Sequence, residues 1–210
     1  MPAFSARMWE ATSWSTWPRR DVLAPLCEDL SVLRKDESAH HGAERHIVLL
    51  GAMGVGKTTV GRELARRLER PFLDSDSELE DLHGATGAEI ASREGVSRLH
   101  RIELDVFDGL VEGGTPSVIA PAASVVDSET GRQLLARNIT VWLDAPAEIL
   151  ATRREESDHR REVDETEAGA LERRRQPHWE ALASFRVDTS GTVGETVDIL
   201  MSHLRGLDSR

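Results

Sequence analysis

Residues 51–58, GAMGVGKT, follow the apolar run Ile47–Leu50 and precede an Arg-rich helical pattern. They match G-x-x-x-x-G-K-[ST], in the strand-to-helix context that this phosphate-binding loop requires. Glycines let the backbone N–H groups curl around a phosphate, and the N-terminus of the following helix adds partial positive charge. We therefore predict a nucleotide site in which Lys57 reaches the outer phosphates and Thr58 binds Mg²⁺. Its predicted members are Gly51, Gly54, Val55, Gly56, Lys57, Thr58 and Thr59.

The composition supports this assignment of Lys57. The only lysines of the chain are Lys35 and Lys57, and every other cationic side chain apart from histidine is arginine. A compact ammonium fits inside such a loop, whereas a planar guanidinium does not. The lysine at position 57 therefore indicates a specific requirement there.

Short apolar runs alternate with longer helical patterns beyond residue 45. Such alternation predicts right-handed crossovers and a parallel sheet with helices on both faces, hence an α/β protein with a three-layer α/β/α fold and a five-stranded parallel sheet. The expected strands are His46–Leu50, Pro71–Asp74, Ser117–Ala120, Thr140–Asp144 and Arg186–Asp188. The expected helices include Lys57–Glu69, Gly87–Val111, Glu129–Arg137 and Thr192–Arg205.

Residues 1–45 form a predicted N-terminal extension to the domain at 46–210. A tryptophan-bearing leader comes first, with no clear period. Asp21–Lys35 then shows apolar residues at helical spacing, with Asp21 placed as a cap, and a polar linker follows. This extension could contact a partner protein.

Charge and composition limit the classes of partner. The net charge of -11 argues against non-specific binding to nucleic acid or to an anionic membrane surface. No stretch approaches the about 20 apolar residues of a membrane span. The single cysteine, Cys27, excludes an internal disulfide framework and fits a reducing cytoplasm. We expect a cytoplasmic monomer that binds small molecules, with no nucleic-acid or membrane partner.

Two carboxylates follow the second predicted strand, in Phe72-Leu-Asp74-Ser-Asp76. Ligands of an open parallel sheet bind at the carboxyl ends of its strands, so both carboxylates should face the same crevice as the loop. One can organise Mg²⁺ through its waters, and the other can take the proton of an attacking hydroxyl. The alternative is a plain strand end at which Asp76 or Ser77 caps a helix.

The ordered set of motifs resembles the shikimate kinases over residues 46 to about 205. The set comprises the phosphate loop, D-x-D at 74–76, SRLHRIELD, VIAPAASVV, RRRQPHW and RVDTSG. The resemblance implies a P-loop kinase fold and ATP-dependent phosphoryl transfer, with Mg²⁺, to a hydroxyl of a small carboxylic acid. It also implies roles for particular residues: Asp76 would hold the reacting hydroxyl, Asp74 would stand behind the magnesium waters, and Glu103 would brace the acceptor site.

Arginines complete the site that the resemblance implies. Arg175 would grip the carboxylate of the acceptor, and Arg153 or Arg154 would stack on adenine. Arg160 and Arg161 lie where a lid arginine would reach the transferred phosphate, with Arg161 as the expected catalytic residue. The lid segment EESDHRREVDETEAG is short and highly charged, and the alternative for it is a solvated loop.

Two departures from the family pattern fall in the expected acceptor pocket. His100 replaces an arginine that lies one helical turn before the glutamate. Ala122, Ala123 and Ser124 replace three glycines, and the added methyl groups fill acceptor space and disfavour positive φ. We therefore expect an altered acceptor site beside an intact nucleotide site.

Three functions stay open at this point. The first is a shikimate kinase-type enzyme that acts on shikimate or an altered acceptor. The second is a ligand-sensing module that keeps the nucleotide loop and has lost turnover; the altered residues and the extension suit it. The third is another P-loop kinase, for gluconate or a nucleoside monophosphate, which explains Arg175 and the SRLHRIELD helix less well.

Overall fold

The computed structural model describes residues 45–156 and 165–208. Their centre is a five-stranded sheet of order β2-β3-β1-β4-β5, in which every pairing is parallel. The strands are β1 (Ile47–Leu50), β2 (Phe72–Asp74), β3 (Val118–Ala120), β4 (Ile139–Asp144) and β5 (Phe185–Asp188). The predicted parallel sheet is confirmed, and each predicted strand lies within two residues of an observed one.

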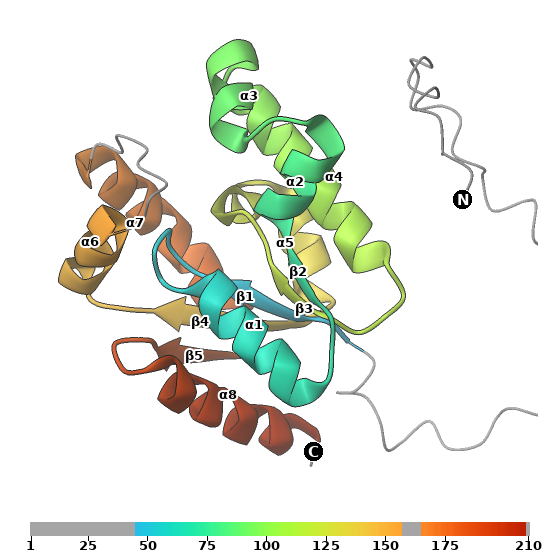
Figure 1. Cartoon of the computed structure of the whole chain (residues 1–210), viewed down its shortest axis with the longest axis vertical. Coiled ribbons are helices and arrows are strands. Elements are labelled where there is room, and N and C mark those ends of the chain that lie inside the picture. The colour runs from blue at the N-terminus through green and yellow to red at the C-terminus, as the bar shows by residue number, and fades with distance from the viewer. Residues whose placement is uncertain (1–44, 157–164, 209–210) are drawn as a thin grey trace, which may run out of the picture. The chain divides into compact units, whose positions relative to one another are not determined.

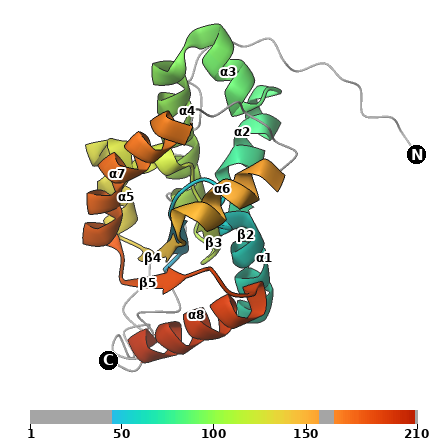
Figure 2. The same cartoon turned by 90° about the vertical axis from the view of Figure 1, so that its left-hand side faces the viewer.

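Helices cover both faces of this sheet (Figures 1 and 2). α1 (Lys57–Leu68) and α8 (Val193–Asp208) lie together on one face, and α4 (Val96–Glu112), α5 (Glu129–Ala136) and α7 (Glu165–Leu182) lie on the other. The remaining elements are α2 (Ser75–His83), α3 (Gly87–Glu94), the 3₁₀ helix η2 (Ala123–Asp127) and α6 (Ala147–Glu156). The predicted three layers are therefore present.

The prediction of one continuous helix over Gly87–Val111 is wrong, because the structure has two helices there. Gly95, with φ 86° and ψ 155°, separates α3 from α4. This backbone conformation is open to glycine and costly for other residues, so the chain turns there. Thr86 and Glu89 form a capping box at the start of α3. A helix at α2 was predicted only as the alternative at the strand end, and α6 and α7, which contains Pro177, were not predicted.

Two hydrophobic clusters hold the fold together. The main core joins the sheet to its covering helices, and Leu49, Leu64, Phe107 and Leu143 are fully buried in it. A smaller cluster joins α2, α3 and α4 away from the sheet. Its buried members are Leu79, Ala85, Ile90, Leu99, Ile102 and Val106.

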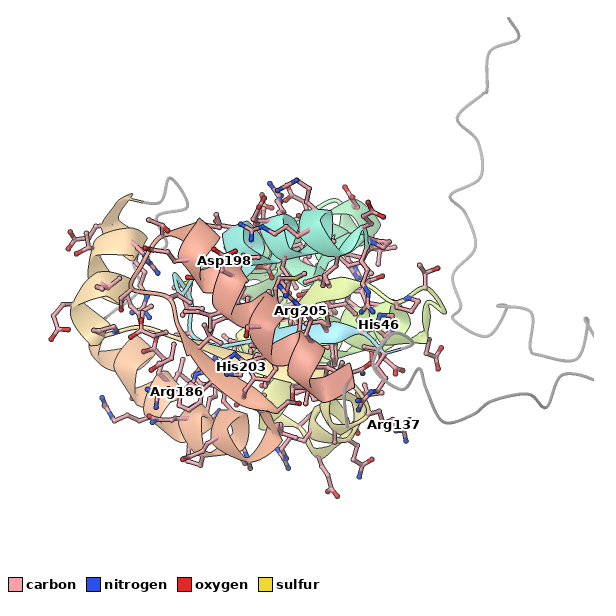
Figure 3. The ribbon with its side chains drawn as sticks, turned by 90° about the horizontal axis from the view of Figure 1, so that it is seen from below. His46, Arg137, Arg186, Asp198, His203 and Arg205 are labelled. Carbon is pink, nitrogen blue, oxygen red and sulfur yellow. The ribbon has the colours of Figure 1, made fainter. Side chains whose placement is uncertain are left out.

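α8 closes the face of the sheet that α1 also covers (Figure 3). Asp198 of α8 pairs with Arg67 of α1, and the His203 ring stacks on Phe185 with 4.7 Å between centroids. On β5, the Arg186 guanidinium lies 4.4 Å from the ring centroid of Trp142. The first of these contacts joins α8 to α1, and the second joins α8 to β5.

Several predictions lie outside the described residues. They are the leader, the helix Asp21–Lys35, Cys27 and the arginines at 160 and 161, so Arg161 stays a prediction. The division at residue 45 also stays a prediction. None of the helices in the described part of the chain is long and apolar enough to cross a membrane.

Candidate active site

The loop between β1 and α1 is built around glycines with left-handed backbone conformations. Gly51, Gly54 and Gly56 have φ values of 141°, 84° and 99°. A Cβ on Gly51 would lie 2.4 Å from the Leu143 carbonyl oxygen of β4. The loop therefore lies close against the neighbouring strand, and only glycine satisfies both the dihedral and the space.

Lys57 begins α1 and turns its ammonium back into the loop. Its Nζ donates to the carbonyl oxygens of Gly51 at 2.9 Å and Ala52 at 3.0 Å. Burial lowers the pKa of Lys57 to about 8, the carboxylates of Asp76 and Asp74 act to raise it, and the Arg175 guanidinium acts to lower it. The phosphate loop, the acidic end of β2 and Arg175 therefore share one electrostatic environment.

Thr58 and Asp74 meet across the crevice between the loop and β2. Thr58 Oγ1 donates to Asp74 Oδ2 at 2.7 Å. Asp74 Oδ1 accepts from the Asp76 N–H at 3.1 Å, so Asp74 is the N-cap of α2. The alternative that Asp76 or Ser77 caps this helix is wrong, because the extended backbone of Asp74 puts the cap at the strand end. Asp76 lies in the first turn of α2, with an exposed side chain.

This pair of oxygens fits a magnesium site. Mg²⁺ takes hard oxygen ligands, and proteins hold it through one or two carboxylates together with water and substrate phosphates. The hydroxyl of Thr58 and the carboxylate of Asp74 offer two such oxygens beside the loop. In the described part of the chain no group of three or more His, Cys, Asp and Glu side chains could hold a metal by itself. A metal at this position would therefore depend on phosphate oxygens as well.

Both candidate adenine arginines of α6 contact the loop. Arg154 Nε donates to the Met53 carbonyl at 3.0 Å, and its Nη2 pairs with Glu172 of α7. Arg153 Nη2 donates to the Thr189 carbonyl, after β5, at 2.6 Å. The two arginines thus connect α6 with the loop, α7 and the end of β5, and the expected stacking on adenine stays a prediction.

The segment after β3, which carries Ala122 and Ala123 where the resemblance predicts glycines, has an unstrained backbone. Ala122 has φ -58° and ψ 141°, and the described non-glycine residues with positive φ amount to Glu69 alone. The side chains of Ala122 and Ala123 are partly buried and pack against the main core. The expected conflict with positive φ is therefore absent, because the chain enters η2 from an ordinary extended conformation.

Ser124, the third of these residues, forms a side-chain hydrogen bond to α4. Its buried hydroxyl donates to Glu103 Oε2 of α4. This contact connects the segment after β3 to the glutamate expected to brace the acceptor. Both residues were predicted in the acceptor pocket from the sequence, whereas the bond between them was not.

Arg175 lies on α7 and binds a carboxylate of this chain. Its Nε and Nη2 donate to both oxygens of Asp127, with Nη2 at 2.7 Å from Oδ2. Asp127 is the last residue of η2, and its position after the end of β3 is the one local signal that could have identified it. His100 of α4 lies near enough to act on the charge of Asp127.

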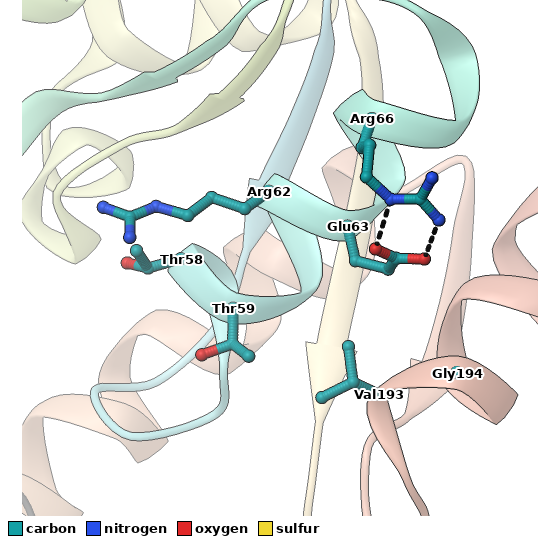
Figure 4. A pocket seen from close by; sticks show the side chains of 7 residues that line it. All are labelled: Thr58, Thr59, Arg62, Glu63, Arg66, Val193 and Gly194. Carbon is teal, nitrogen blue, oxygen red and sulfur yellow. Dashed lines mark hydrogen bonds and ion pairs between the residues drawn. The ribbon is translucent and has the colours of Figure 1, made fainter.

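A shallow depression lies beside the loop, between the first turns of α1 and the start of α8 (Figure 4). In it, Arg66 pairs with Glu63 at 2.8 Å, and the hydrogen bonds from Arg66 and Arg67 lower the pKa of Glu63 to about 2. The carboxylate of Glu63 is therefore paired within α1, while Arg62 lies over the Phe72 ring of β2 at 5.8 Å from its centroid. The lining residues are Thr58, Thr59, Arg62, Glu63, Arg66, Val193 and Gly194.

Comparisons with known proteins show which family this chain resembles. The family model for shikimate kinase matches residues 53–205. The shikimate kinase of Bradyrhizobium diazoefficiens is 32% identical over 170 residues, which are 77% of this chain and 82% of that protein. The shikimate kinase of Rhodopseudomonas palustris is 37% identical over 110 residues, which are 52% of this chain and 54% of that protein.

A solved structure gives the same result. The shikimate kinase from Acinetobacter baumannii, in complex with shikimate, superimposes with a TM-score of 0.70 at 32% identity, covering 79% of this chain and 93% of that one. The predicted fold is thereby confirmed. Since the family model spans well over half of the sequence, and a relative above 30% identity is covered over most of its length, this chain belongs to the shikimate kinase family.

Proposed function

We propose that this chain transfers the γ-phosphoryl group of ATP to a hydroxyl of shikimate. The observation that carries the proposal is the geometry of the loop: the Lys57 ammonium lies inside it, Thr58 bonds to Asp74 at the end of β2, and Asp76 and Arg175 lie close enough to act on the charge of Lys57. A cation for the phosphates, a carboxylate for a hydroxyl and a cation for an acceptor carboxylate therefore face one crevice. Phosphoryl transfer needs this positioning and charge stabilisation more than covalent chemistry.

The residues of the crevice divide the work by their chemistry. The loop N–H groups and Lys57 hold the phosphates, while Asp76, exposed at the start of α2, orients the hydroxyl and accepts its proton. Arg175 binds the carboxylate of the acceptor, with Glu103 and His100 lining the same side. Arg154 borders the nucleotide through its contact with Met53, and Arg161 stays the proposed lid cation.

Thr58 and Asp74 would hold Mg²⁺ in this scheme. The two side chains already share a hydrogen bond of 2.7 Å at the mouth of the loop. A bound Mg²⁺ neutralises negative charge on the phosphates. Asp74 also caps α2, and this cap fixes the position of Asp76 two residues later.

Family membership favours this enzyme over the two other functions considered. A ligand sensor without turnover has no need of Asp76, and the family model over residues 53–205 is that of shikimate kinase rather than of a gluconate or nucleotide kinase. Asp76 is present in the first turn of α2 and acts on the charge of Lys57.

The direct test is ADP release from Mg-ATP with shikimate as the acceptor. Asp76→Asn should lower kcat by about 10²–10⁴-fold, the range for a lost acid or base group, with Mg-ATP affinity retained. The matched control is Asp81→Asn, which removes an exposed carboxylate from the same helix and should leave kcat unchanged. Nucleotide binding without ADP release on shikimate by the unmodified chain would contradict the proposal.

A further inference from the structure

The pairing of Arg175 with Asp127 engages one full edge of the guanidinium. Nε lies 3.1 and 3.2 Å from the two carboxylate oxygens, and Nη2 lies 2.7 Å from Oδ2. The Arg175 side chain is 11% exposed and that of Asp127 is 18% exposed. Water therefore screens this pair only weakly, and the bidentate geometry is the one in which an arginine holds a carboxylate most strongly.

The surroundings of the pair place it at the acceptor side of the crevice. Asp127 ends the short helix that starts at Ala123 and includes Ser124, whose hydroxyl donates to Glu103. Arg175 acts on the charge of Lys57. The pair thus lies close enough to Lys57 to act on its charge, and Asp127 shares η2 with Ser124, the partner of Glu103.

The local charges favour an ionised Asp127. Burial acts to raise the pKa of its carboxyl, but hydrogen bonds and charge from Arg175, together with the charges of Arg174 and His100, hold this pKa below its ordinary value. Arg174 contributes at 3.3 Å from an exposed position, with 64% of its side chain accessible. At neutral pH a carboxylate of this chain therefore balances the positive charge of Arg175.

We infer that Asp127 is a specificity-determining residue, which competes with the carboxylate of the acceptor for Arg175 and so weakens selection for an anionic acceptor. This inference rests on the proposed function, in which Arg175 binds that carboxylate. An incoming carboxylate must displace Asp127 or share Arg175 with a negative charge in contact with it. Either event reduces what the ion pair with Arg175 adds to acceptor binding.

The experiment compares two acceptors that differ in one charge, shikimate and its methyl ester. Calorimetric titration gives their Kd values for the unmodified chain and for Asp127→Asn, which keeps the shape and one acceptor oxygen. Removing the competing charge should tighten shikimate binding by about tenfold, the factor for one hydrogen bond to a charged group. The Kd of the ester should stay the same.

Glu129→Gln is the matched control, since it removes an exposed negative charge close by in the sequence and should change neither Kd. Unchanged or weaker shikimate binding by Asp127→Asn, or an equal change for the ester, would overturn the inference. The unmodified chain supplies a measurement that needs no variant. It should bind the two ligands with similar Kd values, and a preference for shikimate of about 100-fold, as expected of an uncompensated arginine, would also overturn the inference.

ADP release separates this inference from the proposed function. Tighter shikimate binding by Asp127→Asn without ADP release from any form of the chain would support competition for Arg175 and contradict the kinase. ADP release, together with the same shikimate Kd for the unmodified chain and for Asp127→Asn, would support the kinase and contradict the competition.

Discussion

The nucleotide side and the acceptor side of the crevice are built from different parts of the chain. On the nucleotide side, glycine backbone and Lys57 form a loop that lies against β4. On the acceptor side, the wall of the crevice is formed by side chains from α4, η2 and α7. α2 and α4, which carry Asp76 and Glu103, also share a small hydrophobic cluster of their own.

This difference explains why we expect departures from the family pattern on the acceptor side and not on the nucleotide side. A backbone cradle depends on dihedral angles that few residues can adopt, as the φ of 141° at Gly51 shows, so most substitutions there are costly. A wall of side chains can change by single replacements if each new polar group finds a partner. Ser124 donates a hydrogen bond to Glu103, and Asp127 accepts hydrogen bonds from Arg175.

The largest expected effect among the following predictions is confined to the nucleotide side. Asp74→Asn should lower the apparent affinity for Mg²⁺ in the ADP-release assay by about 10–100-fold, the usual cost of losing an outer-shell carboxylate. Asparagine caps helices about as well as aspartate, so the thermal unfolding temperature should hardly move. Titration of Mg²⁺ at fixed ATP measures the effect, and the Kd of shikimate without nucleotide is the control. A parallel loss of shikimate binding would show that the two sides are not separable.

The pKa of Lys57 predicts a pH effect of intermediate size. Contact with phosphate favours the ammonium and raises its pKa in the complex above the value of about 8 in the free protein. Mg-ATP affinity is then complete below the free-protein pKa and falls as pH rises through it, by about tenfold one unit higher. Calorimetric Kd values for Mg-ATP across this range measure the fall.

Lys57→Met supplies the control for that pH dependence. The variant has no titrating group in the loop, so its weaker Mg-ATP binding should not change over the same range. Shikimate binding by the unmodified chain, measured alongside, should change less than Mg-ATP binding. An equal slope in the variant would assign the titration to another group.

The smallest expected effect is confined to the acceptor side. Ser124→Ala removes the hydroxyl that donates to Glu103 and leaves the backbone of η2 intact. A hydrogen bond to a charged group contributes about 1.5–3 kcal/mol, and because Ser124 acts on the acceptor only through Glu103, we expect a part of this, about fivefold, in the Kd of shikimate. Ser202→Ala, at an exposed position of α8, is the matched control. Weaker Mg-ATP binding by Ser124→Ala would contradict the division between the two sides.

The sequence alone determined the sheet, the phosphate loop and the residues expected to line the crevice. Apolar runs and glycine spacing are local signals, because each strand or turn reflects the dihedral preferences and burial of its own residues. The same local reasoning joined α3 and α4 into one helix, since a periodic pattern does not reveal a turn at a single glycine such as Gly95.

Only the tertiary structure decided how the functional side chains are paired. Thr58 meets Asp74 because α1 and β2 are packed side by side, and Asp127 meets Arg175 because α7 lies against η2. Neither pairing follows a sequence period, since each joins residues that separate elements carry to the same place. The charge that an acceptor encounters at Arg175 is therefore set by packing between elements, which no single stretch of sequence specifies.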